Sequence, residues 1–164
     1  MQIRVLTVED LGAYRALHRF ALEESPEAFV ETLANDAARA DETVAAMLER
    51  GEAWGVFEGE RLLGKLVIDA LPYDCLVHTR WLHAVYLHPD ARGTGAGMAL
   101  AQAALAHAQS QGAARVALWV NERNAAARRM YERLGFVETG RVPGGIFVAG
   151  SFVDDVLMTL KLTP

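Results

Sequence analysis

The stretch HPDARGTGAGMALAQAALAHAQSQG, residues 88–112, decides the fold. Its second half is rich in alanine, a strong helix former, so we expect a helix from about Gly95 to Gln111 that ends at Gly112. Glycine is a poor helix former, yet three glycines at alternate positions open this helix. Glycines have no side chain to shield the backbone, and Arg92 just before them adds a positive charge. The stretch therefore predicts a helix N-terminus that is open to a ligand.

Phosphate or pyrophosphate is the ligand that this loop suits. Free N–H groups at a helix N-terminus bind anions, and the helix dipole assists them. The loop is not a P-loop, because it lacks the required lysine and the Ser/Thr that follows it. It is not a dinucleotide fingerprint either, because Met98 stands where the third glycine belongs and no acidic residue follows about 20 residues on.

The segments around the loop alternate between strand-like and helix-like patterns. A helix should follow Thr7, which can form a capping box with Asp10. We expect the other helices at 27–50, in two pieces that meet near Ala40, and at 124–134. We expect strands at residues 2–6, 53–58, 62–71, 80–87, 114–120, 136–142 and 151–162, with a turn at residues 143–145.

Size and composition predict a single domain over residues 1–164, and the alternation of strands and helices predicts a mixed α/β fold. The chain has 164 residues, of which 52% are hydrophobic, and this is enough for one core. It has no apolar run of membrane-spanning length and no signal-peptide pattern, so we expect a cytoplasmic protein without a membrane partner. One cysteine, Cys75, excludes a disulfide framework and a cysteine metal site, and we expect no metal. The net charge of −5 argues against nucleic acid as the main partner.

Two motifs in sequence order closely resemble the GNAT superfamily of N-acetyltransferases. The first is R-x-x-G-x-G, which resembles that superfamily's acetyl-CoA pyrophosphate loop and is filled here by Arg92, Gly95 and Gly97. The second is the block N-x-x-A-x-x-x-Y-x-x-x-G-F, which is filled by Asn124, Ala127, Tyr131, Gly135 and Phe136. The resemblance is strong over residues 81–142, and the order of the flanking elements is compatible with it.

The resemblance implies a fold and a cosubstrate site. It implies a central mixed sheet of about seven strands, splayed in the middle and flanked by about four helices. It also implies that acetyl-CoA binds through backbone amides at the loop and through strand-like pairing of its pantetheine arm. The residues that it assigns to acetyl-CoA are Val85, Tyr86, Leu87, Arg92, Gly93, Thr94, Gly95, Ala96, Gly97, Met98, Asn124 and Ala127.

Acetyl transfer to an amine needs an acid for the departing thiolate and a base for the ammonium. The tyrosine of the family block is the family's acid, which here is Tyr131, and a phenol with a pKa of about 10 keeps its proton at neutral pH. For the base we propose His83, because histidine titrates near neutrality. The strands that carry a glutamate in many relatives have no carboxylate here. Loop carboxylates at Glu122, Glu24 and Asp74, or a chain of water molecules, remain alternatives for the base.

Other side chains are weaker candidates for a catalytic or cofactor-binding role. Cys75 could accept the acetyl group first, although nothing beside it in the sequence lowers its pKa. Arg128 and Arg129 are either contacts for the outer phosphate of acetyl-CoA or solvated helix charges. Trp54, Trp81 and Trp119 lie in strand patterns and should belong to the core or to a pocket wall.

The sequence thus predicts an enzyme that moves acetyl from acetyl-CoA directly to a primary amine of a small molecule or peptide. Acidic segments near Glu23 and Asp74 are consistent with a cationic acceptor. The alternative is a non-catalytic acyl-CoA-binding module, whose function would survive Tyr131→Phe. A protein that binds ATP or NAD is a second alternative, and self-association through the terminal strands stays open.

Overall fold

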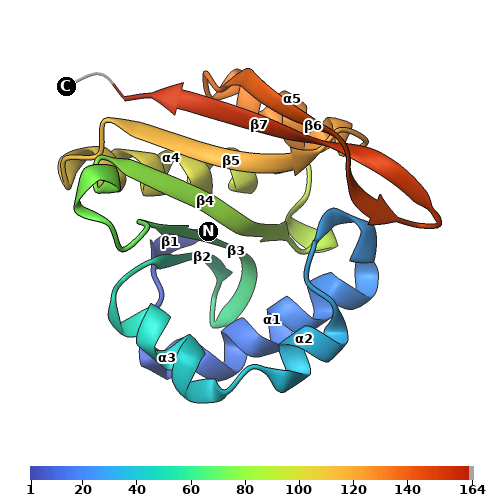
Figure 1. The fold of residues 1–164 in the computed structure, drawn as a ribbon. Helices are drawn as coiled ribbons and strands as arrows, with labels where there is room; N and C mark the ends of the chain where they lie inside the picture. Colours follow the sequence, from blue (N-terminus) through green and yellow to red (C-terminus); the bar gives the residue numbers. More distant parts are fainter. Residues whose placement is uncertain (163–164) are drawn as a thin grey trace. The chain divides into compact units, whose positions relative to one another are not determined.

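The computed structural model describes residues 1–162, which form two compact units (Figure 1). The first unit comprises residues 1–68 and 84–104, and the second comprises residues 69–83 and the chain from Leu105 onward. Two elements, β4 (Thr79–Leu87) and α4 (Ala96–Ser110), run from one unit into the other. The expectation of one domain over residues 1–164 stays a prediction.

The first unit joins three antiparallel strands to three helices. Its strands are β1 (Gln2–Val5), β2 (Ala53–Glu58) and β3 (Arg61–Asp69), and its helices are α1 (Leu11–Glu24), α2 (Leu33–Ala38) and α3 (Asp41–Glu49). Leu17 of α1 and Leu48 of α3 pack with Leu6, Phe57 and Val67 in one buried apolar cluster. Burial of these side chains is what stabilises the amphipathic helices against the sheet.

The second unit is built on β5 (Arg115–Asn121), β6 (Val137–Val148) and β7 (Ser151–Lys161), with α5 (Ala125–Arg133). β7 is antiparallel to both β5 and β6, whereas β4 is parallel to β5. The seven strands pair in the order β1-β2-β3-β4-β5-β7-β6. This mixed sheet confirms the predicted α/β class with about seven strands.

The structure has five α-helices among the described residues, whereas the family resemblance implied about four. Two of the five lie in the predicted segment 27–50, which is interrupted. Thr32 caps α2 by accepting the Asn35 amide, and Arg39 and Ala40 then adopt extended backbone before α3 begins. The break near Ala40 is therefore confirmed, and the helical start near Glu27 is replaced by a short 3-10 turn, Pro26–Ala28.

The turn predicted at residues 143–145 is wrong. β6 continues through this segment as a bulge, with a register shift between Val142 and Ile146 opposite β7. The Gly144 amide donates to Asp154 Oδ1 at 2.9 Å, so a side chain replaces the missing ladder partner. The hairpin turns instead at Ala149 and Gly150, whose φ values of +49° and +78° are the positive pair that a tight two-residue hairpin requires.

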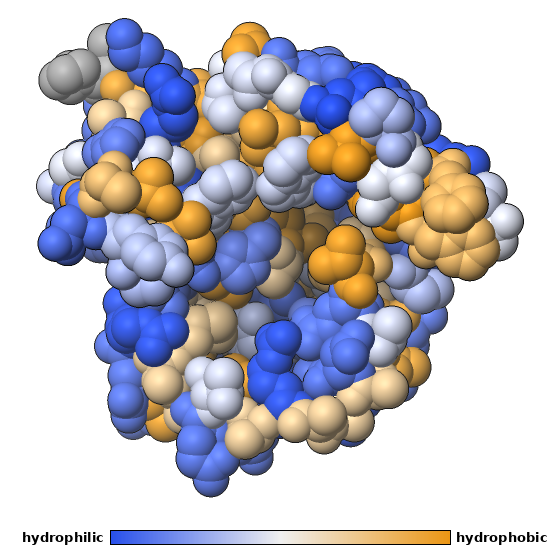
Figure 2. Space-filling model, viewed as in Figure 1, coloured by the Kyte–Doolittle hydropathy of each residue, from blue (hydrophilic) through white to orange (hydrophobic). Residues whose placement is uncertain are grey.

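The tip of this hairpin is apolar and exposed. Phe147 and Phe152 have exposed fractions of 66% and 73%, and their ring centroids lie 5.1 Å apart. Figure 2 shows hydrophobic atoms gathered at the far right, over the end of the β6–β7 hairpin. No helix among the described residues is long and apolar enough to cross a membrane.

A fully buried lysine fixes the course of β4. Lys65 of β3 donates from Nζ to the Ala84 carbonyl at 2.9 Å and lies over the Tyr14 ring. Ala84 has φ +51°, a left-handed conformation that is uncommon for a residue with a Cβ. The regular parallel pairing of β4 with β5 involves Thr79–Trp81, before this irregular point.

Lys65 makes the stability of the protein depend on pH. Burial lowers the pKa of Lys65 to about 7 from its ordinary value of 10.5, although Glu31 and Asp36 partly offset the effect. Between these two pH values the unfolded chain binds a proton that the folded chain does not, so stability should rise with pH. We expect the advantage of Lys65→Met over the wild type to shrink as pH rises from 7 to 10 in urea titrations. Lys161→Met, which alters an exposed lysine, is the control, and a difference independent of pH would contradict this account.

Candidate functional site

The glycine loop, residues 92–98, leads into α4, and its backbone is not covered by side chains at the glycines. Gly93 and Gly95 have φ values of +75° and +84°, and a Cβ built on either would meet no atom within 4 Å. Thr94 Oγ donates to the Ala91 carbonyl and accepts from the Ala96 amide, which closes the turn before the helix. The amides of Gly97 and Met98 lie in the first turn of α4, where no helix carbonyl can accept them. These features leave backbone donors at the start of α4 available to an anion.

Arg92 is already engaged with a carboxylate. Its guanidinium donates to both Glu24 oxygens at 3.0 and 2.8 Å, and its Nε donates to the Leu87 carbonyl at 3.1 Å. The Tyr86 hydroxyl donates to the same carboxylate at 3.0 Å. The cation that the sequence offers to phosphate is therefore neutralised by the last residue of α1, which is 68 positions away in the chain and was not foreseen as its partner.

This pairing weakens one of the alternative bases. The Arg92 hydrogen bonds hold the pKa of Glu24 at about 2, with help from Ser25 and Tyr86. A carboxylate of such low basicity is a poor proton acceptor at neutral pH. Burial and the Glu24 carboxylate raise the pKa of Tyr86 to about 12. Tyr86 is buried, whereas Val85 and Leu87 on either side of it are half-buried.

The family block spans α5 and ends at Phe136, just before β6, in the second unit. Asn124 caps α5 by accepting the Ala127 amide at 3.1 Å, which confirms the predicted helix start. The Tyr131 ring is buried and packs edge-on against Phe136, with ring centroids 5.7 Å apart. Burial raises the pKa of Tyr131 well above its usual 10, so this phenol keeps its proton at neutral pH.

His83 of β4 is paired with a residue that the sequence did not single out. Its Nε2 lies 2.8 Å from Asp69 Oδ2, at the end of β3, and both residues belong to the second unit. Half of the His83 side chain is exposed. Asp69 and His83 lie 14 positions apart in the sequence. Their contact could be found only by knowing how the two chain segments lie in the fold.

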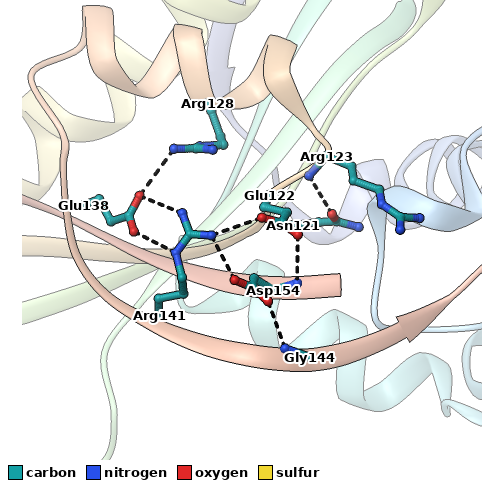
Figure 3. Close-up of polar contacts among 8 residues, drawn as sticks. All are labelled: Asn121, Glu122, Arg123, Arg128, Glu138, Arg141, Gly144 and Asp154. Carbon is teal, nitrogen blue, oxygen red and sulfur yellow. Dashed lines mark hydrogen bonds and ion pairs between the residues drawn. The ribbon is translucent and has the colours of Figure 1, made fainter. Parts of the chain in front are cut away.

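Glu122, another alternative base, belongs to a network of charges on the second unit (Figure 3). Arg141 donates to Glu122 and Asp154 at 3.0 and 2.9 Å, and its Nε donates to Glu138 at 3.0 Å. Glu138 also accepts from Arg128 at 3.3 Å. Glu122 is thus held in an ion pair that joins the residue after β5 to the β6–β7 hairpin.

The Arg141 network should stabilise the hairpin through charge. Arg141→Met leaves three carboxylates close together without their shared cation, so we expect a melting temperature a few degrees lower at low salt. The loss should diminish in high salt, because ions screen the remaining repulsion. Thermal melts of the wild type, Arg141→Met and the exposed control Arg129→Met test this. An equal loss at low and high salt would contradict the electrostatic explanation.

The remaining predicted residues are more exposed. Asp74 and Cys75 lie on a short exposed 3-10 turn, Asp74–Leu76, and Arg129 lies on the open face of α5. Trp54 and Trp81 are half-buried, whereas Trp119 is 45% exposed and does not belong to the core.

One cluster in the first unit has the composition of a metal site. Ligand atoms of His18, Glu31 and Asp36 lie within 4.8 Å of one another. Arg39 lies 2.7 Å from Glu31, and Arg15 lies 3.6 Å from Asp36. Burial lowers the pKa of His18, and Lys65 lowers it further. The carboxylates are therefore compensated by side-chain cations.

Comparison with curated proteins finds acetyltransferases. A segment of 55 residues is 51% identical to mycothiol acetyltransferase of Thermobispora bispora, and it covers 34% of this chain and 19% of that protein. A segment of 82 residues is 35% identical to the L-methionine sulfoximine/L-methionine sulfone acetyltransferase of Pseudomonas aeruginosa, and it covers 50% of this chain and 48% of that protein. The chain thus spans less than half the length of either relative.

Solved structures share the fold over nearly the whole chain. The ribosomal-protein-alanine N-acetyltransferase from Brucella melitensis superposes with a TM-score of 0.81 at 24% identity, covering 99% of this chain and all of that one. The protein yncA from Salmonella typhimurium, solved with its cofactor acetyl-CoA, gives 0.82 at 23% identity, covering 100% of this chain and 95% of that one.

The family comparison confirms the predicted acyltransferase class. The model described as the acetyltransferase (GNAT) family matches residues 13–136, a range that includes both the glycine loop and the block with Tyr131. This range is well over half of the chain. The protein therefore belongs to the GNAT family of acetyltransferases.

Proposed function

We propose that the protein transfers an acetyl group from acetyl-CoA directly to a primary amine of a small molecule or peptide. The observation that carries this proposal is the open glycine loop of the first unit in a chain of the GNAT family. Backbone amides from Arg92 to Met98 would hold the pyrophosphate of acetyl-CoA. Val85, Tyr86 and Leu87 would pair with the pantetheine arm through their backbone groups.

Residues of the second unit would carry out the chemistry. His83 removes a proton from the ammonium of the acceptor, and the free amine attacks the thioester carbonyl. The C–N bond forms and the C–S bond breaks, while the Tyr131 hydroxyl gives its proton to the departing sulfur. The second proton of the attacking nitrogen then returns through water to the tyrosinate. The net proton released to solvent is the one that His83 accepted.

The acetyl-CoA contacts of α5 are part of the same proposal. The Ala127 amide already donates to Asn124 Oδ1 at the helix start. Both residues would therefore contact the cofactor through their exposed surfaces and not through this amide. We place the protein in the cytoplasm as a metal-independent enzyme without nucleic-acid or membrane partners. Self-association through the exposed end of the β6–β7 hairpin is compatible with these assignments.

A panel of amines tests the proposal and identifies the acceptor. Amino acids, polyamines, aminoglycosides and short peptides are each incubated with acetyl-CoA and protein, and acetylated products are identified by mass spectrometry. L-Methionine sulfoximine and L-methionine sulfone belong in the panel because the Pseudomonas relative carries their names. We expect one class to be acetylated. Binding of acetyl-CoA without any acetylated product would favour the alternative, a non-catalytic acyl-CoA-binding module.

A further inference from the structure

The contact between His83 and Asp69 fixes which ring nitrogen of the histidine carries the proton. A carboxylate can only accept a hydrogen bond, so the nitrogen that faces it must carry a hydrogen. Nε2 lies 2.8 Å from Asp69 Oδ2 and is therefore the protonated nitrogen of the neutral ring. Nδ1 then carries the lone pair. Among the described residues, no side chain or backbone group hydrogen-bonds to Nδ1 of His83.

Two of the carboxylates considered as alternative bases have a cation as their partner. Glu24 is bound by Arg92 through two hydrogen bonds, and Glu122 is bound by Arg141. The Arg92 guanidinium stabilises the charged form of Glu24 and lowers the pKa of that carboxyl group. His83, by contrast, has a carboxylate as its partner, with Nε2 lying 2.8 Å from Asp69 Oδ2.

We propose that Asp69 is a positioning residue, which holds His83 in the Nε2–H tautomer and leaves Nδ1 to accept the proton of the acceptor ammonium. This inference rests on the proposed function. When Nδ1 takes the proton, the ring becomes an imidazolium with a hydrogen on both nitrogens, and Asp69 stabilises its charge. The ammonium becomes a neutral amine in the same step, so the only transfer is that of one proton from the amine nitrogen to Nδ1.

Nitrogen NMR of the histidine ring tests the positioning without any substrate. In wild-type protein at pH 8, the ¹⁵N shifts of His83 should report the Nε2–H tautomer. In Asp69→Asn, whose amide can either donate or accept, the ring should populate both tautomers. A wild-type ring in the Nδ1–H tautomer would overturn the proposal.

Kinetics test whether this positioning serves the reaction. With the amine identified by the panel, Asp69→Asn should lower kcat about 10-fold while the KM for acetyl-CoA stays near that of the wild type. Asp69→Glu, which retains a carboxylate, should recover part of the loss. Glu60→Gln, which removes an exposed carboxylate from the β2–β3 turn, is the control and should match the wild type.

A double-mutant cycle separates positioning from general damage to the fold. In a His83→Gln background, Asp69→Asn should have no further effect on kcat, because Asp69 acts through the histidine. An equal loss in both backgrounds would overturn the proposal. If wild-type protein acetylates no amine, the proposed function fails and the proton-accepting role fails with it. If wild-type protein is active and Asp69→Asn is equally active, only the role of Asp69 fails.

Discussion

Tyr131→Phe should lower kcat about 100-fold while the affinity for acetyl-CoA stays near that of the wild type. The substitution removes only the hydroxyl, and the ring keeps its buried contact with Phe136. Without the phenol, the thiolate must leave without a positioned proton donor. Steady-state kinetics at saturating amine, together with calorimetric titration of acetyl-CoA, measure the two quantities separately.

A second buried tyrosine provides the matched control for this substitution. Tyr14 in the first unit is also buried, and burial raises its pKa to about 12. Tyr14→Phe therefore removes a comparable buried hydroxyl, and we expect it to retain kcat. Equal kcat values for Tyr131→Phe and the wild type would contradict the acid role, and they would favour a different proton donor.

Gly95→Ala should weaken acetyl-CoA binding about 100-fold, equivalent to about 2.8 kcal/mol. Gly95 has φ +84°, and its missing Cβ leaves open space where the proposed pyrophosphate approaches the backbone. A methyl group there would hold the phosphate oxygens away from the amides at the start of α4. Calorimetric titration of the variant with acetyl-CoA measures the loss.

Gly112 separates this effect from backbone strain. It has φ +83°, and a Cβ built there also meets no atom within 4 Å. Each alanine variant should therefore lose about 1 kcal/mol of stability, because both force a side chain into the left-handed region. Only Gly95→Ala should lose affinity for acetyl-CoA. Equal affinities of the two variants would show that the loop does not hold the cosubstrate.

Local patterns predicted the secondary structure around the site well. Asn124 caps α5, the alanine-rich helix begins at Ala96, and the break near Ala40 occurs where it was expected. Each of these features depends on residues within one or two turns of chain. The segment 143–145 was misjudged because Pro and Gly suit a bulge as well as a turn, and the partner that decides between them is the distant Asp154.

Contacts between remote residues could not be predicted in this way. The carboxylate of Glu24 neutralises Arg92, and Asp69 binds His83, yet neither partner lies near in the sequence. The charge of a side chain is visible in the sequence, but the ion that compensates it depends on how the strands and helices pair. The sequence therefore indicated which groups could act, and the fold determines which of them are already engaged.

The most direct test of the central claim is the rate of thiol release from acetyl-CoA with and without amine. We expect the rate to rise with amine concentration and to saturate, with one acetylated amine formed per thiol released. Tight binding of acetyl-CoA without acceleration by any amine would contradict catalysis. Failure to bind acetyl-CoA would contradict the role assigned to the loop from Arg92 to Met98.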